Sequence, residues 1–333
     1  MGVDLKMLTL SETKISEPLC NVMEPRTEFC EIENSDVRVN ANMSSVYVVS
    51  SQGENVISAG NNSWTIRRYA RKDDVTAINL IREWSVKQAS AVGLKEILKG
   101  LSTEYELIDI DKELEQVHCF PRVTVGLKAS RKEMTFDPFR YSYSMKDFRE
   151  FLRTTYSLKR ANAIKIRDGQ HQLHKARLLI LSRNRTRCFT NTGEITEMER
   201  DLGYKVTVEE ADRNVSKFAN VVNSCDVMVG VHGAGFLNNL FLPENAIFIQ
   251  IVPVGNFEWI STTYYGGPAK DMNLKYLEYK ISNEESTLIQ QYPLDHAVFT
   301  DPDSIGKQGW TAFKSIYLNK HNVRLNVTRN PRC

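Results

Sequence analysis

The stretch from Cys225 to Pro253 constrains the fold of this chain more than any other part of the sequence. It begins with an apolar run, Val227 to Val231, whose length fits a strand that is buried on both faces. Small residues follow, and a helical pattern then runs from about Gly235 to Pro243, where proline would break a helix. A second apolar run, Ala246 to Val252, indicates the next strand. A strand, a tight turn, a helix and a strand in this order predict a parallel sheet.

The turn within this unit predicts a binding place for a phosphate or a diphosphate. Gly233, Ala234 and Gly235 let a ligand approach the backbone, and the helix after them offers free N–H groups and the positive end of its dipole. His232 stands at the carboxyl end of the strand, where open α/β sheets bind ligands. It would hydrogen-bond a phosphate oxygen, or stay neutral and orient a sugar. Glycines at such turns are also often required only for steric reasons, so the motif alone leaves a structural role open.

Two better known nucleotide motifs are absent from this stretch. It contains no P-loop ending in Gly-Lys-Ser/Thr, and Asn238 occupies the last place of a Gly-X-Gly-X-X-Gly pattern. The sequence therefore argues against an ATPase and against a dinucleotide-dependent enzyme.

A loop with three arginines, Ser182 to Arg187, follows an earlier buried strand, Arg177 to Leu181. A planar guanidinium matches phosphate oxygens, so these arginines are suited to grip a diphosphate; an exposed basic loop is the alternative. Helices are predicted over residues 194–202 and 214–223, and a strand over 205–208. Together with the later stretch they make a β-α-β-α-β-α-β pattern, which is one half of a doubly wound sheet.

The composition fits a globular protein of one or two domains, with 333 residues. The 43 basic and 41 acidic side chains give a formal net charge of +2, so there is no electrostatic reason to expect nucleic-acid binding. No apolar run reaches the roughly 18 residues of a membrane span, and residues 1–14 lack the apolar core of a signal peptide. Taken literally, the sequence predicts a soluble chain without a targeting segment.

Other features favour a secretory compartment. The number of Asn-X-Ser/Thr sites exceeds the roughly two or three that chance would give. These sites are Asn42, Asn61, Asn184, Asn214 and Asn326. None of the six cysteines belongs to a Cys-X-X-Cys pair, so no zinc site is predicted. Cys20 and Cys30 would close a short loop if the compartment is oxidising.

Several motifs, taken in order along nearly the whole chain, resemble the plant members of glycosyltransferase family 61. They are Pro18-Leu19-Cys20 with Cys30, Trp64 to Lys72, Val117 to Pro121, Val125 to Lys128, Tyr143 to Arg149, Leu179 to Arg187, Val229 to Gly235, Phe241 to Pro243 and Gln250 to Pro253. A set of motifs in one order is far more specific than any one of them, so the chain is identified by resemblance as a member of this family.

The resemblance implies an inverting glycosyltransferase with a GT-B-like α/β fold, in which two Rossmann-like domains face each other across a cleft. It implies that a pentose, arabinofuranose or xylose, moves from UDP-arabinofuranose or UDP-xylose to cell-wall xylan or a related glycan. It further implies a place on the lumenal face of the Golgi membrane, reached through an N-terminal anchor.

The resemblance also implies which residues hold the donor. By position they are Ser182, Arg183 and Arg187 near the diphosphate, and His232, Gly233, Ala234 and Gly235 around it. Arginines and a helix dipole can replace a metal as charge builds on the leaving UDP, so no metal site is expected and a metal is not expected to be essential. No catalytic base is assigned, because His118 and the Glu209-Glu210 pair are more readily explained as structural.

The chain departs from the family pattern in two respects. It shows no N-terminal anchor, and it lacks a long segment that the family carries between the positions of Gln88 and Leu94. We therefore expect an irregular N-terminal stem (residues 1–45), an incomplete N-terminal acceptor-side domain (46–165) and a C-terminal nucleotide-sugar-binding domain (166–333). The alternative to an active enzyme is a catalytically inactive shortened isoform or remnant that at most binds UDP or a partner.

Overall fold

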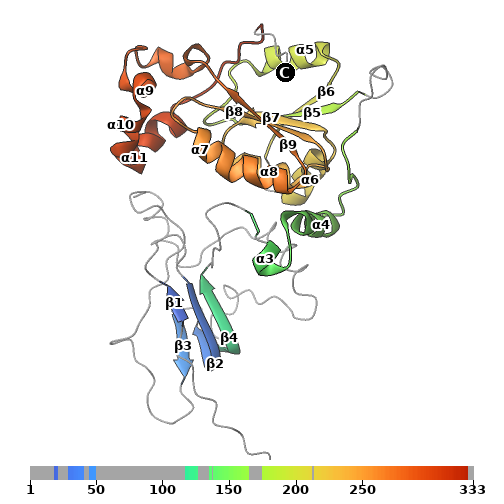
Figure 1. The fold of residues 1–333 in the computed structure, drawn as a ribbon, viewed down its shortest axis with the longest axis vertical. Coiled ribbons are helices and arrows are strands. Elements are labelled where there is room, and N and C mark those ends of the chain that lie inside the picture. Colours follow the sequence, from blue (N-terminus) through green and yellow to red (C-terminus); the bar gives the residue numbers. More distant parts are fainter. Residues whose placement is uncertain are drawn as a thin grey trace, which may run out of the picture. The chain divides into compact units, whose positions relative to one another are not determined.

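The computed structural model describes residues 135–136, 138–164, 175–211 and 214–328, and the backbone of four strands that come earlier in the sequence. Figure 1 shows the elements of the fold. The chain divides into two compact units, which we describe separately. One comprises residues 1–89 and 108–129, and the other comprises residues 90–107 and 130–333.

The described strands of the first unit form an antiparallel sheet around one long strand. The long strand β2 (Phe29–Asn40) pairs with β1 (Leu19–Asn21), with β3 (Ser45–Val49) and with β4 (Val117–Gly126). The register between β2 and β4 shifts where β4 carries Pro121, which has no N–H to donate to the ladder.

This unit differs from the sequence-based expectation in two ways. The stem expected over residues 1–45 contains β1 and β2, because cross-strand pairing outweighs the weak alternation of the charged β2 sequence. The described strands are antiparallel, whereas a Rossmann-like domain has a parallel sheet. The register makes Cys20 and Cys30 direct partners across β1 and β2. Residues 42, 61, 64–72 and 88–94, which the sequence analysis singled out, lie outside the described part of the chain.

The second unit contains a five-stranded parallel sheet with the order β6-β5-β7-β8-β9. Its strands are β5 (Arg177–Ser182), β6 (Lys205–Glu210), β7 (Val227–Val231), β8 (Ile247–Val252) and β9 (Lys275–Lys280). The helix α5 (Thr192–Asp201) covers one face, and α6 (Val215–Asn223) and α8 (Gly267–Asp271) cover the other (Figure 1). The doubly wound parallel sheet predicted from the sequence is therefore confirmed.

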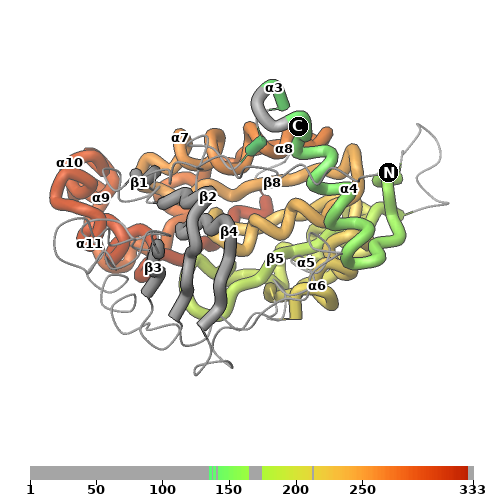
Figure 2. The backbone as a smooth tube through the Cα atoms, turned by 90° about the horizontal axis from the view of Figure 1, so that it is seen from below, coloured from blue at the N-terminus to red at the C-terminus, as the bar shows by residue number. Residues whose placement is uncertain are grey.

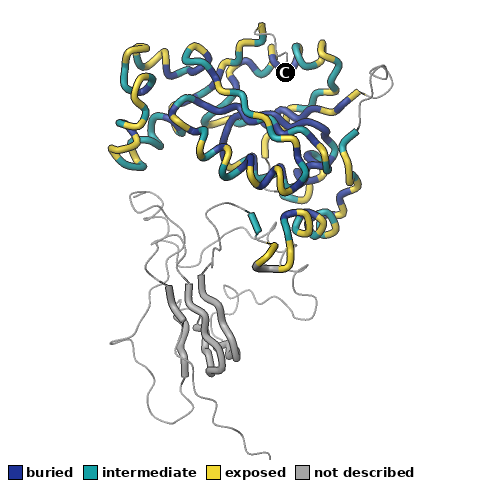
Figure 3. The backbone as a smooth tube through the Cα atoms, viewed as in Figure 1, coloured by how far each residue is buried: buried dark blue, intermediate teal, exposed yellow. Residues whose placement is uncertain are grey.

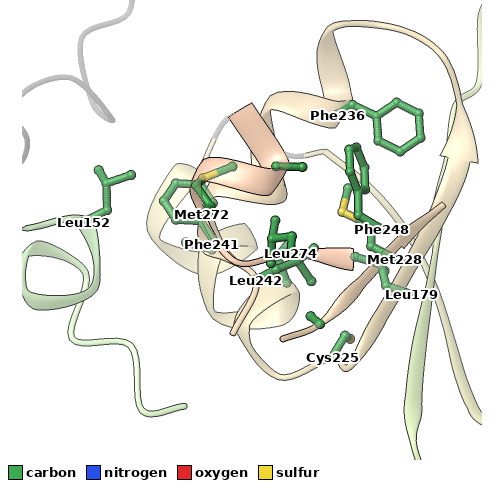
Figure 4. Close-up of a cluster of buried hydrophobic side chains, with 14 of the residues drawn as sticks. Leu152, Leu179, Cys225, Met228, Phe236, Phe241, Leu242, Phe248, Met272 and Leu274 are labelled. Carbon is green, nitrogen blue, oxygen red and sulfur yellow. The ribbon is translucent and has the colours of Figure 1, made fainter. Parts of the chain in front are cut away.

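Alternate residues of the central strands enter two separate cores. Leu179 and Leu181 of β5 pack with α6 and α8, whereas Leu178 and Ile180 of the same strand pack with α5. Figure 4 shows Leu179 within the first of these cores. All four side chains are at most 2% exposed, and Figure 3 shows burial concentrated in the strands. A strand that is buried on both faces reads as a continuous apolar run, as the sequence does here. Each such side chain contributes about 1.5–3 kcal/mol to stability.

The helix α4 (Met145–Thr155) joins the core of the second unit, although the sequence analysis placed residues up to 165 in the first domain. Ser144 and Asp147 form the capping box that starts the helix. Leu152 on its apolar face is 1% exposed and belongs to the core cluster drawn in Figure 4. The apolar spacing of a helix indicates which face is buried but not which core covers it.

Short helices follow β9 and lie at the end of the second unit opposite α4 (Figures 1 and 2). The apolar spacing predicts one helix over residues 303–319, but the structure has α10 (Pro302–Lys307), α11 (Trp310–Phe313) and η6 (Lys314–Asn319). Gly309, with a φ of 103°, separates the first two. The remaining helical elements are α3 (Pro138–Tyr141), η2 (Ala234–Phe241), α7 (Glu258–Ser261), η3 (Thr262–Gly266), η4 (Asn283–Glu285), η5 (Thr287–Gln290) and α9 (Ala297–Thr300).

Within the described residues, no helix has both the length and the apolar character needed to cross a membrane.

A buried carboxylate holds together the start of the parallel sheet. Asp226 is 5% exposed and immediately precedes β7. Its Oδ2 accepts a hydrogen bond from the Arg177 N–H (2.9 Å), and its Oδ1 accepts one from the Ile164 N–H (2.9 Å). Oδ1 also pairs with the guanidinium of Arg160. One side chain therefore joins two strands and the segment before them.

We predict that Asp226→Ala lowers the free energy of unfolding by about 3–5 kcal/mol, because a buried ion pair is broken and two N–H groups lose their acceptor. Urea denaturation followed by circular dichroism measures the change. Glu150→Ala, which breaks an exposed ion pair with Arg153, is the control and should cost far less. Equal losses in the two variants would contradict the prediction.

Candidate functional site

The chain leaves two neighbouring strands toward opposite faces of the sheet. From β5 it runs to α5 on one face, and from β7 it runs to η2, whose buried side chains belong to the core on the other face. Ligands of open α/β sheets bind beyond the carboxyl ends of the strands at such a switch point. Ser182 is the last residue of β5 and Arg183 follows it, and His232 and Gly233 follow the last residue of β7. The topology therefore brings the two sequence-predicted segments together.

Gly233 lies against the side chains of two arginines. A Cβ atom at this position would stand 2.6 Å from Nη1 of Arg183 and 2.9 Å from Nη1 of Arg187. The φ and ψ of Gly233, 155° and 176°, belong to a region that only glycine occupies readily. The Arg187 Nη1 donates a hydrogen bond to the carbonyl of His232 (3.0 Å), and the Tyr265 hydroxyl donates one to the carbonyl of Gly233 (3.0 Å). Glycine is required here so that two guanidiniums can reach the turn.

These two guanidiniums have no acidic partner among the described residues. The ion pairs formed by those residues involve other side chains. Burial, and next to it the charge of Arg183, lowers the pKa of Arg187 to about 10. A lowered arginine pKa means that positive charge is unfavourable at this place. An anion bound between the guanidiniums would relieve the repulsion.

The start of η2 adds backbone donors to the same place. The helix that the sequence predicted from about Gly235 is η2, which is a 3₁₀-helix. Its first hydrogen bond runs from the N–H of Phe236 to the carbonyl of Gly233 (2.9 Å). The N–H groups of Ala234 and Gly235 precede this bond and have no acceptor within the helix. They are available to a ligand that lies at the turn.

The C-terminal part of the chain supports the arginine loop. The N–H of Arg187 donates to the carbonyl of His321 (2.7 Å), and the N–H of Cys188 donates to Oδ1 of Asn322 (2.9 Å). Within the loop, Nε of Arg183 donates to the carbonyl of Thr186 (2.8 Å). Arg187 has a φ of 54°, a conformation that costs energy for a residue other than glycine. These bonds hold a strained loop in place.

His232 is buried, and its ring is neutral. The side chain is 6% exposed, and its ring lies 5.1 Å from that of Phe257 and 5.5 Å from that of Tyr265. Burial, followed by the charges of Arg187 and Arg183, lowers the pKa of His232 to about 3. Of the two forms that the sequence leaves open, burial and the two arginines thus favour the neutral imidazole.

Four other residues singled out in the sequence lie at the ends of β5 and β6 or in the arginine loop. Ser182 is half-buried at the end of β5, and Arg185 is exposed, with none of its atoms among those nearest to Gly233. Glu209 and Glu210 are exposed at the end of β6, where Glu210 accepts a hydrogen bond from the N–H of Asn184 (3.3 Å).

Further predicted features are distributed over both units. His118 belongs to β4, which is a strand of the antiparallel sheet in the first unit. The potential glycosylation sites Asn184, Asn214 and Asn326 are exposed. Within the described ranges, no group of three or more His, Cys, Asp or Glu side chains is arranged to hold a metal ion.

The sequence analysis did not identify the residues that support the site from other elements. Tyr265 in η3, Gln250 in β8, Ser261 in α7 and the backbone of His321 contact the two central segments. Gln250 stands in an otherwise apolar buried strand, and a fully buried amide must find hydrogen-bond partners. That was the one signal in the sequence that pointed to a buried polar cluster.

Two buried neutral histidines make the folded chain sensitive to acid. His321 is fully buried, with Nε2 2.9 Å from Oγ of Ser286. Burial, and then the charge of Arg187, lowers its pKa from 6.5 to about 4, while that of His232 falls to about 3. Below pH 6.5 the unfolded chain binds protons at both rings and the folded chain does not, so stability falls as the pH drops through this window.

We predict that His321→Gln reduces this acid sensitivity. Between pH 6.5 and 4, the free energy of unfolding should fall less steeply for the variant than for the wild type. The gap between the two proteins should change by up to about 1.4 kcal/mol per pH unit. Urea denaturation at stepped pH measures it, and two parallel pH profiles would refute the prediction.

Comparison with known proteins yields one family and several relatives. Residues 91–249 match the family described as Glycosyltransferase 61. The alpha-1,3-arabinosyltransferase XAT2 of Oryza sativa subsp. japonica is 35% identical over 389 residues, which cover 98% of this chain and 65% of the relative. The beta-1,2-xylosyltransferase XYXT1 of the same plant is 45% identical over 71% of this chain and 50% of the relative. The xylan glycosyltransferase MUCI21 of Arabidopsis thaliana is 35% identical over 80% of this chain and 54% of the relative.

The chain spans between half and two thirds of the length of these curated relatives. The stretch that matches the family contains both the arginine loop after β5 and the turn after β7. The residues that meet at the switch point thus lie in the part of the chain that defines the family, and we conclude that the chain belongs to glycosyltransferase family 61.

Proposed function

We propose that the place beyond β5 and β7 binds the diphosphate of a UDP-sugar donor. The observation that carries the proposal is the pair of guanidiniums, Arg183 and Arg187, that lie against Gly233 without an acidic partner in the described residues. The N–H groups of Ala234 and Gly235 add two hydrogen-bond donors. A diphosphate supplies the negative charge and the acceptor oxygens that match this arrangement.

The reaction we propose is an inverting transfer of a pentose. An acceptor hydroxyl attacks the anomeric carbon of the donor, the bond between that carbon and the UDP oxygen breaks, and a general base takes the hydroxyl proton. Negative charge develops on the leaving UDP, where Arg183, Arg187 and the start of η2 stabilise it, with Ser182 beside them. Because these groups supply positive charge, we expect that a metal is not essential. The base remains unassigned.

The substrates follow from the relatives by analogy. XAT2 is named an arabinosyltransferase, XYXT1 a xylosyltransferase and MUCI21 a xylan glycosyltransferase. We propose UDP-arabinofuranose or UDP-xylose as the donor, and cell-wall xylan or a related glycan as the acceptor. A GT-B-like architecture, in which a second domain binds the acceptor, completes the proposal, and the Golgi lumen is the compartment that suits exposed glycosylation sites.

We further propose that the acceptor-side domain is shortened near residues 88–94. The alignment with XAT2 extends over 389 residues, more than the 333 of this chain, so the relative carries residues inside the aligned stretch that have no counterpart here. Loss of part of a domain would affect acceptor binding more than donor binding, because the donor residues lie in the second unit.

We predict that the chain binds UDP with micromolar affinity and that Arg183→Ala weakens binding by about 10- to 100-fold, as expected when a charge-assisted hydrogen bond to phosphate is lost. Calorimetry measures the affinity, and a double variant, Arg183→Ala with His232→Ala, should lose binding altogether. The matched control is Arg185→Ala, an exposed arginine of the same loop, which should change the affinity by less than about threefold.

Two results would refute the donor site. One is the absence of UDP binding to a chain whose circular dichroism and cooperative unfolding show that it is folded. The other is an equal loss of affinity in Arg185→Ala and Arg183→Ala, which would indicate a general basic surface. Binding of UDP without transfer from UDP-xylose or UDP-arabinofuranose to xylo-oligosaccharides would leave the donor site in place and favour the inactive shortened form.

A further inference from the structure

Behind His232, three side chains from different elements form a hydrogen-bonded cluster. Gln250 of β8 and Ser261 of α7 are fully buried, and Tyr276 of β9 is half-buried. Nε2 of Gln250 lies 2.5 Å from Nδ1 of His232 and 3.2 Å from Oγ of Ser261. The hydroxyl of Tyr276 lies 2.8 Å from Oε1 of Gln250. The amide of Gln250 is thus held at both ends.

We propose that Gln250 is a positioning residue that decides which ring nitrogen of His232 carries the proton, so that Nε2–H is offered to the donor phosphate. The inference rests on the proposed donor site. When the hydroxyl of Tyr276 donates to Oε1 of Gln250, the amide N–H groups face His232. An amide nitrogen only donates, so Nδ1 must accept and the ring proton must reside on Nε2.

The second buried polar group fits the same arrangement. Oγ of Ser261 accepts one amide hydrogen of Gln250 at 3.2 Å and lies 3.3 Å from Nδ1 of His232. The amide thus uses both of its hydrogens, one toward Nδ1 of His232 and one toward Oγ of Ser261. In this arrangement each hydrogen of the amide has an acceptor.

The other nitrogen of His232 is left for a ligand. Nε2 makes no hydrogen bond to the described residues. The described polar atoms that are both fully buried and without a partner do not include Nε2. It therefore keeps access to solvent. The carbonyl of the same residue accepts a hydrogen bond from Arg187, and the charges of Arg187 and Arg183 both lower the pKa of the ring, so the ring lies within electrostatic reach of the two guanidiniums. An N–H group at this place attracts a phosphate oxygen, whereas a lone pair would repel it.

The tautomer matters because the imidazole is neutral. A charged ring would donate from both nitrogens, and Gln250 would then have no donor role. Burial, and then Arg187 and Arg183, keeps the pKa of His232 near 3. The neutral ring has one donor and one acceptor nitrogen, and its buried neighbours decide which is which.

A competing arrangement exists within the same cluster. The Tyr276 hydroxyl also lies 2.6 Å from Oε1 of Glu278, which accepts a hydrogen bond from Thr262 (2.9 Å) as well. If the hydroxyl hydrogen went to Glu278 alone, the amide of Gln250 would turn and place Oε1 against Nδ1. His232 would then carry its proton on Nδ1 and present a lone pair to the donor. The two arrangements predict opposite tautomers.

The test measures the tautomer directly, in the whole chain labelled with ¹⁵N-histidine. Protonated and unprotonated ring nitrogens have well separated ¹⁵N shifts, and the His232 signals are assigned by their loss in His232→Asn. We expect a protonated Nε2 and an unprotonated Nδ1 in the unliganded wild type at pH 7. Gln250→Glu offers only acceptor oxygens to Nδ1, so a proton should move onto Nδ1, and UDP affinity should fall about tenfold or more.

Gln290→Glu introduces the same change at an exposed position of η5 and should alter neither the tautomer nor the UDP affinity. If Gln250→Glu does not fold, Gln250→Met removes the donor without adding charge, and the wild-type spectrum still decides. A protonated Nδ1 in the wild type would overturn the inference even if UDP binds. An Nε2–H tautomer that shifts in Gln250→Glu supports it, and a failure of the wild type to bind UDP would then count against the donor site instead.

Discussion

Two positively charged side chains, Arg183 and Arg187, lie close together at the turn after β7, and the structure around the turn holds them there. Arg183 and Arg187 approach each other over Gly233, whose missing side chain leaves them room. Repulsion and burial make this arrangement unfavourable in the free chain, as the lowered pKa of Arg187 reflects. A structure keeps such an arrangement only if its surroundings enforce it. A bound anion would turn the same repulsion into attraction, so the free energy stored here is available for binding.

The surroundings that enforce it come from distant parts of the sequence. The carbonyl of His321 and the side chain of Asn322 hold the arginine loop from the C-terminal part of the chain. The hydroxyl of Tyr265 fixes the carbonyl of Gly233 from the helical segment that follows β8. These supporting groups carry no charge, so they orient the loop and the turn without neutralising the arginines. Truncation within this C-terminal part would therefore loosen the turn and the arginine loop, although it removes none of the residues proposed to hold the donor.

The sequence predicted the parts of the fold that depend on local pattern and simple topology. Runs such as Val227 to Val231 identify buried strands, and the right-handed parallel connections then bring the ends of β5 and β7 together. The core that covers α4 was missed, because it depends on packing against residues far away in sequence. The cluster around Gln250 was missed for the same reason, since its members belong to three separate elements.

A neutral histidine solves a problem that a third cation would create. Arg183 and Arg187 already repel each other, and a charged His232 would add a third positive group to one buried place. The same arginines, together with burial, keep the imidazole uncharged, so it can act as a directional hydrogen-bond donor without increasing the repulsion. Charge and direction are thus supplied by different residues. In the proposed donor site the arginines would attract any compact anion, and the histidine, held in one tautomer by Gln250, would favour one placement of that anion over another.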